Sequence, residues 1–342
     1  MLYSMEVSKS MKEPLVSIVI VHYNGKDFLN RCLNSVLKTN YSRFEVILVD
    51  NGSSDGSLEA VNEVFVYDRR LKIVKNDANV GVAKANNIGI GHAKGKYVVL
   101  LNDDTVVETQ WISELVRVME NDVSIAAAQS KLLLMDHPTL YDCAGLFLDY
   151  DGRTHGRGDS TRDIGQYDKV EEIFTSKSAA MIIRKDVLRK IGLIDSTYFL
   201  YYDETDLCWR FWLAGYKVVY VPSSVVYHKG GGTVQKEISK QVFFQVYLFN
   251  RNRITTLLKN YEIRNLIRYL VPWLTFEIGG IMFEGLKGYR RSSILSSLAR
   301  AEAILWNLRN LRSTWRKRLY VQKIVRRVPD SEVMRKMKLR DA

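Results

Sequence analysis

The stretch YVVLLNDDT, residues 97–105, constrains the fold of this chain more than any other. Its first five residues are apolar or aromatic without alternation, which predicts a strand buried on both faces, as in parallel sheets. Asn102, Asp103 and Asp104 follow at the carboxyl end of that strand, the edge where open α/β sheets bind ligands. Carboxylates at this edge would bind a phosphate through a divalent cation. A strand end followed by the N-cap of a helix near Trp111 is the simpler interpretation.

Other segments repeat this succession of buried strand and helix. The predicted strands span residues 15–22, 44–49, 71–74 and 97–101, and the helices between them span 29–37, 57 onward and 79–91. Alternating strands and helices with short connections predict an α/β fold, with a doubly wound parallel sheet and helices on both faces. The pattern becomes irregular from residue 124 to 167, where we expect a hairpin that turns at Asp151 and Gly152.

Charge divides the chain near residue 233. Of the 50 Lys and Arg residues, 23 lie in residues 234–342, together with 8 of the 38 Asp and Glu residues. That part therefore carries a net charge of +15, whereas the residues before it carry −3. We expect an N-terminal extension at 1–14, an α/β domain at 15–233 and a basic, mainly helical region at 234–342. A basic region can bind nucleic acid, an anionic membrane or a protein, and composition does not choose among them.

Residues 266–283 form the most membrane-like segment. They include Arg268, Pro272 and Glu277, so the uncharged run falls short of the ~20 residues that a spanning helix needs. One interpretation is an interfacial helix whose flanking basic clusters touch anionic lipid. The other is a helical hairpin packed on the α/β domain or on a second subunit. No secretory signal is visible in residues 1–14, so we expect a cytoplasmic protein, or one peripheral on the cytoplasmic face of the membrane.

Further polar residues stand at the ends of predicted strands or at the start of a helix. Asp50 follows the second strand, where a carboxylate can accept hydrogen bonds from a base or a ribose. Asp203 and Glu204 open a helix, an arrangement that the helix dipole alone also favours. His228 follows the last predicted strand, and the glycines at 230–232 would let a phosphate or a metal approach the backbone. A lone histidine is more often structural, so each residue by itself is weak evidence.

In their order along the chain, the motifs resemble glycosyltransferase family 2, the inverting nucleotide-sugar transferases of the GT-A fold, and among these the rhamnosyltransferase-like members. The matching stretches are VSIVIVHYNG, ILVDNGSSDGS, NVGVAKANNIGI, YVVLLNDDT, SAAMIIRKDVLRKIGLID, YFLYYDETDLCWRFWLAGYKVVYVP and VVYHKGGGT. The resemblance covers about two thirds of the chain, which is far more specific than any one motif. It implies a Rossmann-like central sheet with helices on both faces, followed here by a C-terminal helical tail.

The resemblance also implies a role for each matching residue. The donor would be bound by Tyr23, Asn24, Asp50, Asn79, Asn102 and Asp103, the acceptor by Ser178, Ala179 and Trp209, and a Mg²⁺ or Mn²⁺ ion by Asp104 and His228. The family's catalytic base lies in a Glu-Asp pair at the start of the helix after the acceptor-binding segment. Here the pair is reversed, as Asp203 followed by Glu204. Alignment favours Glu204 as the base, and Asp203 remains an alternative.

We therefore expect an inverting, metal-assisted glycosyltransferase with a carboxylate base. The expected donor is of the dTDP-rhamnose or UDP-sugar type, and the acceptor is a hydroxyl of a glycan or a lipid-linked glycan. Through the tail, an anionic membrane surface or a second copy of the chain is a further partner, whereas nucleic acid is not expected.

Three alternatives come from other functional classes. A non-catalytic nucleotide-sugar-binding scaffold of the same fold is supported by the reversed pair. A nucleotidyltransferase would need a Gly-rich basic loop after the first strand, which HYNGKDF does not supply. A nucleic-acid binder rests only on the charge of the tail.

Overall fold

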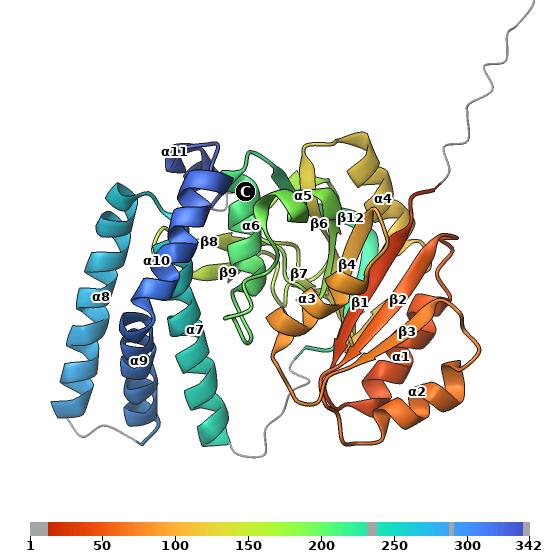
Figure 1. Cartoon of the computed structure of the whole chain (residues 1–342), viewed down its shortest axis with the longest axis horizontal. Coiled ribbons are helices and arrows are strands. Elements are labelled where there is room, and N and C mark those ends of the chain that lie inside the picture. Colours follow the sequence, from red (N-terminus) through yellow and green to blue (C-terminus); the bar gives the residue numbers. More distant parts are fainter. Residues whose placement is uncertain (1–12, 231–237, 287–290, 338–342) are drawn as a thin grey trace, which may run out of the picture.

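The computed structural model of the chain describes residues 13–230, 238–286 and 291–337 (Figure 1). Most of the expected N-terminal extension, and the predicted basic cluster at 287–291 except for the backbone of Arg291, lie outside these residues. The strands are β1 (Val16–His22), β2 (Phe44–Asp50), β3 (Leu71–Lys75), β4 (Tyr97–Asn102), β5 (Thr105–Val107), β6 (Ile125–Leu134), β7 (His137–Cys143), β8 (Leu146–Leu148), β9 (Thr154–Gly156), β10 (Glu171–Glu172), β11 (Ala180–Arg184) and β12 (Lys217–His228).

Helices precede and follow these strands, and they make up most of the C-terminal region. They are α1 (Lys26–Leu37), α2 (Ser57–Phe65), α3 (Val82–His92), α4 (Trp111–Asn121), α5 (Lys185–Ile191), α6 (Asp203–Leu213), α7 (Ile238–Asn260), α8 (Ile263–Leu286), α9 (Arg291–Arg309), α10 (Leu311–Tyr320) and α11 (Asp330–Val333). The predicted alternation of strand and helix up to residue 102 is confirmed, as is the helical character of the region after residue 233.

The central sheet has ten strands in the order β10-β12-β6-β11-β4-β1-β2-β3, with β5 beside β12 and β7 beside β6. Strands β3, β2, β1 and β4 run parallel. Strand β11 is antiparallel to both β4 and β6. The parallel arrangement predicted from the strands up to residue 101 is therefore confirmed, whereas the later strands make the sheet as a whole mixed. An antiparallel strand needs no helical crossover, which is why β11 can enter the sheet directly from the irregular segment before it.

Alternate residues of the central strands supply two hydrophobic cores, one on each face of the sheet. On β1, Ile18 and Ile20 join the core that includes residues of α1, α2 and α4. Val19, between them, joins the core that includes residues of α3, α5, α6 and the C-terminal helices. Helices on both faces explain why the central strands are apolar without interruption. The hairpin predicted at Asp151 and Gly152 is also confirmed, since β8 pairs antiparallel with β9.

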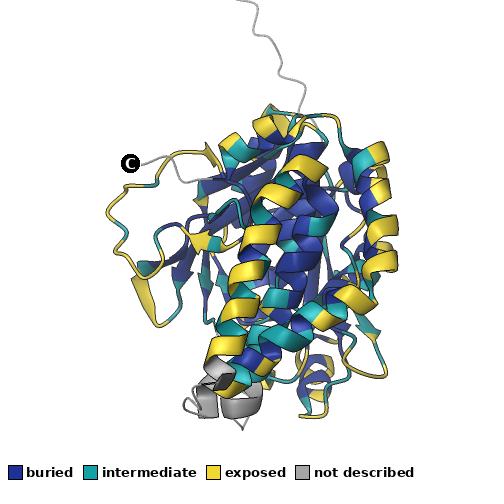
Figure 2. Cartoon of the chain, turned by 90° about the vertical axis from the view of Figure 1, so that its left-hand side faces the viewer, coloured by how far each residue is buried: buried dark blue, intermediate teal, exposed yellow. Residues whose placement is uncertain are grey.

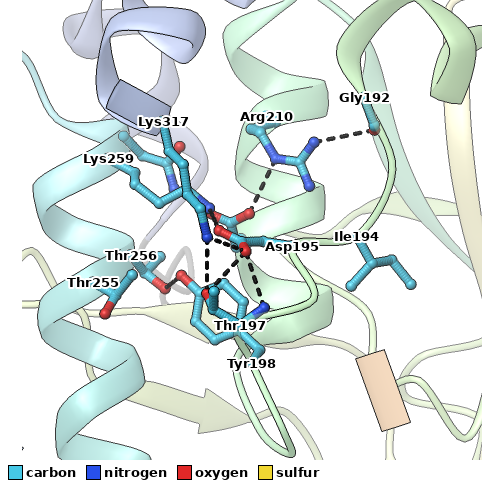
Figure 3. A network of polar contacts seen from close by, with 12 residues as sticks. Gly192, Ile194, Asp195, Thr197, Tyr198, Arg210, Thr255, Thr256, Lys259 and Lys317 are labelled. Atoms are coloured by element: carbon cyan, nitrogen blue, oxygen red, sulfur yellow. Dashed lines mark hydrogen bonds and ion pairs between the residues drawn. The ribbon is translucent and has the colours of Figure 1, made fainter. Parts of the chain in front are cut away.

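The C-terminal helices α7 to α10 lie together at the side of the molecule opposite β3 (Figure 1). A buried ionic network attaches them to the α/β domain, and Figure 3 shows its centre. Lys259 of α7 lies 2.7 Å from Asp195 and 2.8 Å from Asp206 of α6. Lys317 of α10 reaches the other oxygen of Asp195 at 2.6 Å, and Arg210 lies 3.0 Å from Asp206. Through α7 and α10, the region is therefore packed on the α/β domain.

Removal of Asp206 should destabilise the whole chain. Its carboxylate is fully buried; burial by itself would raise its pKa, but Lys259 and Arg210 outweigh that effect and lower the pKa. Asp206→Ala leaves both cations without this partner, so the free energy of unfolding should fall by about 3 kcal/mol or more in denaturant titration. Because the pKa is depressed in the folded state, the difference from wild type should be complete at pH 7 and shrink below about pH 4.

Asp186→Ala provides the matched control for this measurement. Asp186 pairs with Lys190 at 3.4 Å within α5, but its side chain is 57% exposed. Such a surface pair contributes less than about 0.5 kcal/mol. An equal loss in the two variants would show that the Asp206 network does not stabilise the junction.

Candidate active site

A cavity of about 500 Å³ lies at the carboxyl edge of the central sheet. Its wall combines the turn after β1, the end of β4, the segment that leads into α6, and Phe249 of α7. Carboxylates and amides line part of the cavity, and aromatic rings line another part, among them Phe28, Phe199 and Tyr201. This size and this mixture of apolar wall and convergent polar groups are typical of a small-molecule site.

Two of the predicted donor-binding residues lie in the turn after β1. Tyr23 lines the cavity and is 43% exposed. Asn24 also lines it, and its φ angle of 54° is positive. Its backbone N–H donates to Ser53 Oγ at 3.0 Å, and its side-chain oxygen accepts from the Ser54 N–H at 3.0 Å. Asn24 thus ties the turn after β1 to the turn after β2.

Asp50, at the end of β2, lies behind the wall of the cavity. It is buried, and both its carboxylate oxygens lie 3.3 Å from the backbone nitrogen of Ser53. The next residue, Asn51, lines the cavity together with Asn79. The Asn51 amide donates to Asn79 Oδ1 at 2.9 Å. The structure thus brings Tyr23, Asn24 and Asn79 to one cavity and places Asp50 as a support for the turn beside it.

Asp103 lines the cavity and bonds to a buried histidine. Its Oδ2 lies 2.6 Å from Nδ1 of His22, whose Nε2 lies 2.9 Å from Ser57 Oγ. Burial raises the pKa of Asp103, although the hydrogen bond to His22 acts in the other direction. One carboxylate oxygen is therefore engaged by His22, at the junction of β1, β4 and α2.

A chain of polar contacts begins at the end of β4 and passes through His228, which is buried and is not among the cavity residues. Asp104 Oδ1 lies 3.2 Å from Nε2 of His228, at the end of β12. His228 Nδ1 lies 3.0 Å from Asp142 Oδ2, and Asp142 Oδ1 lies 2.6 Å from the Lys177 ammonium. Burial of His228 opposes its charged form, but the two carboxylates outweigh burial and raise the pKa of His228 to about 9. Asn102 completes the cluster, with its Nδ2 3.4 Å from His228 Nε2.

The predicted catalytic pair lies at the start of α6, and both members line the cavity. Asp203 is 2% exposed, and within the described residues its Oδ2 has no hydrogen-bond partner. Burial raises the pKa of Glu204 well above its usual range, and the charge and hydrogen bond of Asp203 raise it further. Burial raises the pKa of Asp203 as well. Two adjacent carboxyl groups with raised pKa values, one of them buried, are typical of a proton-transfer site.

The predicted acceptor residues separate into two groups. Ser178 and Ala179 line the cavity just before β11, and the Ala179 carbonyl accepts from the Asn102 N–H at 3.0 Å. Trp209 is fully buried and is not among the cavity residues. It packs edge-on against Phe174 and Tyr261, with ring centroids 5.5 Å and 4.8 Å away. The prediction that Trp209 contacts the acceptor does not agree with this placement, because the residue belongs to the core.

Comparison with known proteins identifies the family. Residues 17–191 match the family model described as Glycosyl transferase family 2. This chain belongs to glycosyltransferase family 2. It is 32% identical over 119 residues to an uncharacterized glycosyltransferase of Haemophilus influenzae, which is 35% of this chain and 37% of that protein. It is 35% identical over 112 residues to glycosyltransferase GlyG of Streptococcus pneumoniae, 32% of this chain and 37% of that protein. The aligned part thus spans just over a third of the length of these relatives.

Solved structures show the same fold, the GT-A fold. GalNAc-T7 with UDP, GalNAc and Mn²⁺ matches with a TM-score of 0.56 and 18% identity, over 75% of this chain and 53% of that one. Mannosyltransferase PcManGT from Pyrobaculum calidifontis, in complex with GDP-Man and Mn²⁺, matches with a TM-score of 0.55 and 16% identity, over 91% of this chain and 86% of that one. The second match extends well beyond the segment that the family model covers.

Several cavity residues were not predicted from sequence. Lys177 and Asp142 connect the wall to the buried His228, and Tyr201, Tyr202 and Phe249 belong to the aromatic part of the wall. The isolated lysine in the segment FTSKSAAM was the available signal for Lys177. Phe249 lies in the region that the sequence assigned to a separate tail, so no local pattern indicated its place in the cavity.

Two structural neighbours of the same fold contain Mn²⁺, and the chemistry of the residues around Asp104 fits a divalent metal in part. Within the described part of the chain, no group of three or more His, Cys, Asp and Glu side chains is arranged to hold a metal ion. Asp104 and His228 offer two ligands, and Mg²⁺ commonly takes few protein ligands and completes its shell with substrate phosphates and water. The contact of His228 Nδ1 with Asp142 is also the arrangement that orients a metal-binding imidazole. These two side chains can therefore hold a metal that a diphosphate completes.

The two candidates for the catalytic base make different predictions. If Glu204 accepts the proton, Glu204→Gln should lower kcat by about 10²- to 10⁴-fold. Asp203→Asn should then retain turnover and move the acidic limb of the kcat–pH profile to lower pH, because Asp203 raises the pKa of Glu204. If Asp203 is the base, Asp203→Asn abolishes turnover and Glu204→Gln does not.

Profiles of kcat against pH for both variants test this assignment. Asp159→Asn is the matched control, since Asp159 also lines the cavity but is exposed and bonds only to Ser160. Wild-type kcat and an unshifted limb in both isosteric variants would exclude the pair from proton transfer.

Proposed function

We propose that this glycosyltransferase moves a sugar from a nucleoside diphosphate donor to an acceptor hydroxyl, with inversion at the anomeric carbon. The observation that carries the proposal is that one cavity holds two acidic groups with different partners. Asp104 faces His228, whereas Asp203 and Glu204 have raised pKa values and no cationic partner at bonding distance among the described residues. The first group suits a diphosphate with its metal, and the second suits removal of a proton.

Each step can be assigned to residues of the cavity. The acceptor oxygen attacks the anomeric carbon as the bond from that carbon to the phosphate oxygen breaks. The acceptor proton passes to Glu204 or Asp203, and the nucleoside diphosphate leaves with the bonding electrons. The Lys177 ammonium lines the cavity and can offset charge that develops on the leaving group. A single displacement from the opposite side inverts the anomeric carbon.

We propose Mg²⁺ or Mn²⁺ as the cofactor, held by Asp104 and His228. When bound, the ion would neutralise the charge of the departing diphosphate. Two structural neighbours were solved with Mn²⁺, which supports this choice. For the donor we propose a dTDP-rhamnose or a UDP-sugar. The resemblance to rhamnosyltransferase-like members supports the former as the first donor to test.

Replacement of Asp104 should separate metal-dependent turnover from folding. Asp104→Asn keeps the size of the side chain but removes its charge, so release of nucleoside diphosphate should fall at least about 10²-fold. The measurement is diphosphate release across a donor panel with Mn²⁺, Mg²⁺ or EDTA, with Asp159→Asn as the control.

Wild-type activity in Asp104→Asn, or activity that EDTA leaves unchanged, would contradict the metal assignment. Metal-dependent binding of a donor without release, in the presence of candidate acceptors, would favour the non-catalytic scaffold instead.

We also propose that this protein works on an anionic membrane surface, with α8 lying in the lipid interface. Within the described residues, one helical segment, Ile263–Phe283, is long and apolar enough to cross a membrane, and 17% of its most apolar window is buried. One face of α8 packs inward through Leu266, Leu270 and Trp273. A helix held along its length against the protein can lie on a bilayer, whereas it would have to detach to span one.

The outward face of α8 is apolar and lacks exposed acid in its described part. Ile267, Val271, Phe276, Ile278 and Met282 are all exposed, and Figure 2 shows the exposed outer side of these helices. Glu277 lies on the side of α8 that packs on α9, where it bonds to Arg300 at 3.0 Å. Exposed basic residues accompany the face, namely Arg264 and Arg268 on α8, and Arg312 and Arg316 on α10. Apolar surface with basic neighbours is complementary to anionic lipid.

The orientation of α8 relative to the cavity supports a lipid-linked acceptor. The C-terminal end of α8 and the carboxyl end of β1 lie toward the same, lower side of the molecule in Figure 1. The cavity lies at that carboxyl edge of the sheet. A bilayer that contacts the C-terminal half of α8 would therefore lie toward the same side of the molecule as the cavity.

Charges placed on the outward face of α8 should release the protein from vesicles. The double variant Ile278→Glu/Met282→Glu should bind vesicles of phosphatidylglycerol and phosphatidylcholine at least about tenfold more weakly than wild type in co-sedimentation. Pure phosphatidylcholine, or added salt, should weaken wild-type binding. Val64→Glu/Val66→Glu is the matched control, because both valines are about 60% exposed at the far side of the protein, at the end of α2.

Equal binding of the two double variants would contradict the lipid assignment. A dimer in sedimentation velocity that only the α8 variant loses would assign the face to a second copy of the chain.

A further inference from the structure

Two consecutive tyrosines before α6 have left-handed backbone conformations. The φ angles are 67° at Tyr201 and 65° at Tyr202. Residues with a side chain rarely adopt this region, and bulky ones least of all. Such a conformation persists only where neighbouring structure holds it, and it is commonly found at functional sites. Asp203 and Glu204 follow directly, so the backbone at these tyrosines sets the direction of both carboxyl groups.

Asn252 of α7 holds the carbonyls of this segment. Its side-chain amide donates to the Leu200 carbonyl and to the Tyr201 carbonyl, both at 2.8 Å. Its own oxygen accepts from Arg251 Nε at 2.8 Å. Asn252 is almost completely buried. Both N–H groups of this amide thus bond to adjacent carbonyls of the strained segment.

Phe249, one turn earlier on α7, holds the side chains of the same segment. The ring of Tyr201 stacks on Phe249, with centroids 4.3 Å apart and planes 22° apart. The ring of Tyr202 packs edge-on against Phe249, with centroids 6.0 Å apart and planes 84° apart. The Tyr202 hydroxyl donates to the Gly152 carbonyl at 2.9 Å. Residues three apart on a helix share a face, so Phe249 and Asn252 form one contact surface, which we call the α7 clamp.

We infer that the α7 clamp positions the Asp203–Glu204 pair, so that the C-terminal region completes the catalytic half of the active site. The inference rests on the proposed function for the role of the pair. Asn252 and Phe249 are positioning residues in this account, since they act on the carboxyl groups through Tyr201 and Tyr202. The predicted donor residues come from the turn after β1, the segment after β3 and the end of β4, none of which the clamp contacts among the interactions described. Loss of the clamp should therefore slow proton transfer and spare donor binding.

Asn252→Ala tests the inference by separating binding from turnover. Because it frees both carbonyls, kcat for donor turnover should fall about 30- to 100-fold. The acidic limb of its pH profile should shift, because the pKa values of the pair depend on their burial. The dissociation constants of UDP and dTDP with Mn²⁺, measured by calorimetry, should stay within about twofold of wild type. Asn250→Ala is the matched control, since the Asn250 amide bonds only to Val246 within α7.

Hydrogen–deuterium exchange tests the clamp without relying on activity. In Asn252→Ala, the backbone amides of residues 200–207 should exchange at least about tenfold faster than in wild type, while those of residues 97–104 should not change. Phe249→Leu provides a second variant that should fold readily, because Phe249 is 40% exposed. It should show a smaller change at the same amides.

The outcomes separate the clamp from the proposed function. Faster exchange in Asn252→Ala, together with no donor turnover by the wild-type protein, would support the clamp and contradict the proposed chemistry. Unchanged exchange and unchanged kcat in Asn252→Ala would overturn the inference. Equal losses of donor affinity, melting temperature and kcat would overturn it as well, because they would indicate a general structural role.

Discussion

Lys259 lies between two buried carboxylates, and the geometry of the catalytic half depends on this contact. Its ammonium lies 2.7 Å from Asp195 and 2.8 Å from Asp206. Separation of α7 from α6 would leave these charges buried without partners, which costs several kcal/mol. The position of α7 relative to α6 is therefore fixed. The contacts that α7 makes near the cavity through Asn252 and Phe249 depend on this relative position of the two helices. The boundary that charge suggests at residue 233 thus separates two compositions, whereas the active site extends across it.

The same contacts change the meaning of the basic C-terminal region. Its formal charge is +15, but several of its cations are used inside the protein. Lys259 and Arg318 are buried, and Arg318 donates to the carbonyls of Leu258 and Tyr261 at 2.6 Å. Arg253 lies over the ring of Trp273 at 4.2 Å. Among the described residues of this region, the exposed cations are Arg264 and Arg268 on α8, Arg312 and Arg316 on α10, and Arg309, Lys323, Arg327 and Arg335 elsewhere. A smaller, local basic surface favours an anionic lipid interface over the long contact that nucleic acid requires.

Sequence predicted the parts of this fold in which burial leaves a one-dimensional signal. Strand β4 is buried on both faces, so its apolar run is continuous and Asp104 follows at a visible end. The direction of β11 had no such signal, because a central strand is apolar whichever way it runs. The prediction that Trp209 contacts the acceptor does not agree with the structure for a related reason. Every residue of α6 except Glu204 is buried, so helical periodicity cannot distinguish a core residue from a cavity residue. The contacts of His228 with Asp142, and of Asn252 with Tyr201, join residues distant in sequence, which no local pattern records.

The chemistry proposed for the acidic pair explains why the site needs such support. Glu204 with a raised pKa is a stronger base than an exposed glutamate, which favours proton removal near neutral pH. That same property means that the folded state holds a carboxyl group where its charged form is disfavoured. The left-handed backbone conformations of Tyr201 and Tyr202 add a further unfavourable contribution to the free energy of the folded state. Both costs belong to the active site, and both are offset by contacts elsewhere, chiefly those of α7. A helical region that looks peripheral in sequence is then the element that holds the segment proposed as catalytic in its strained conformation.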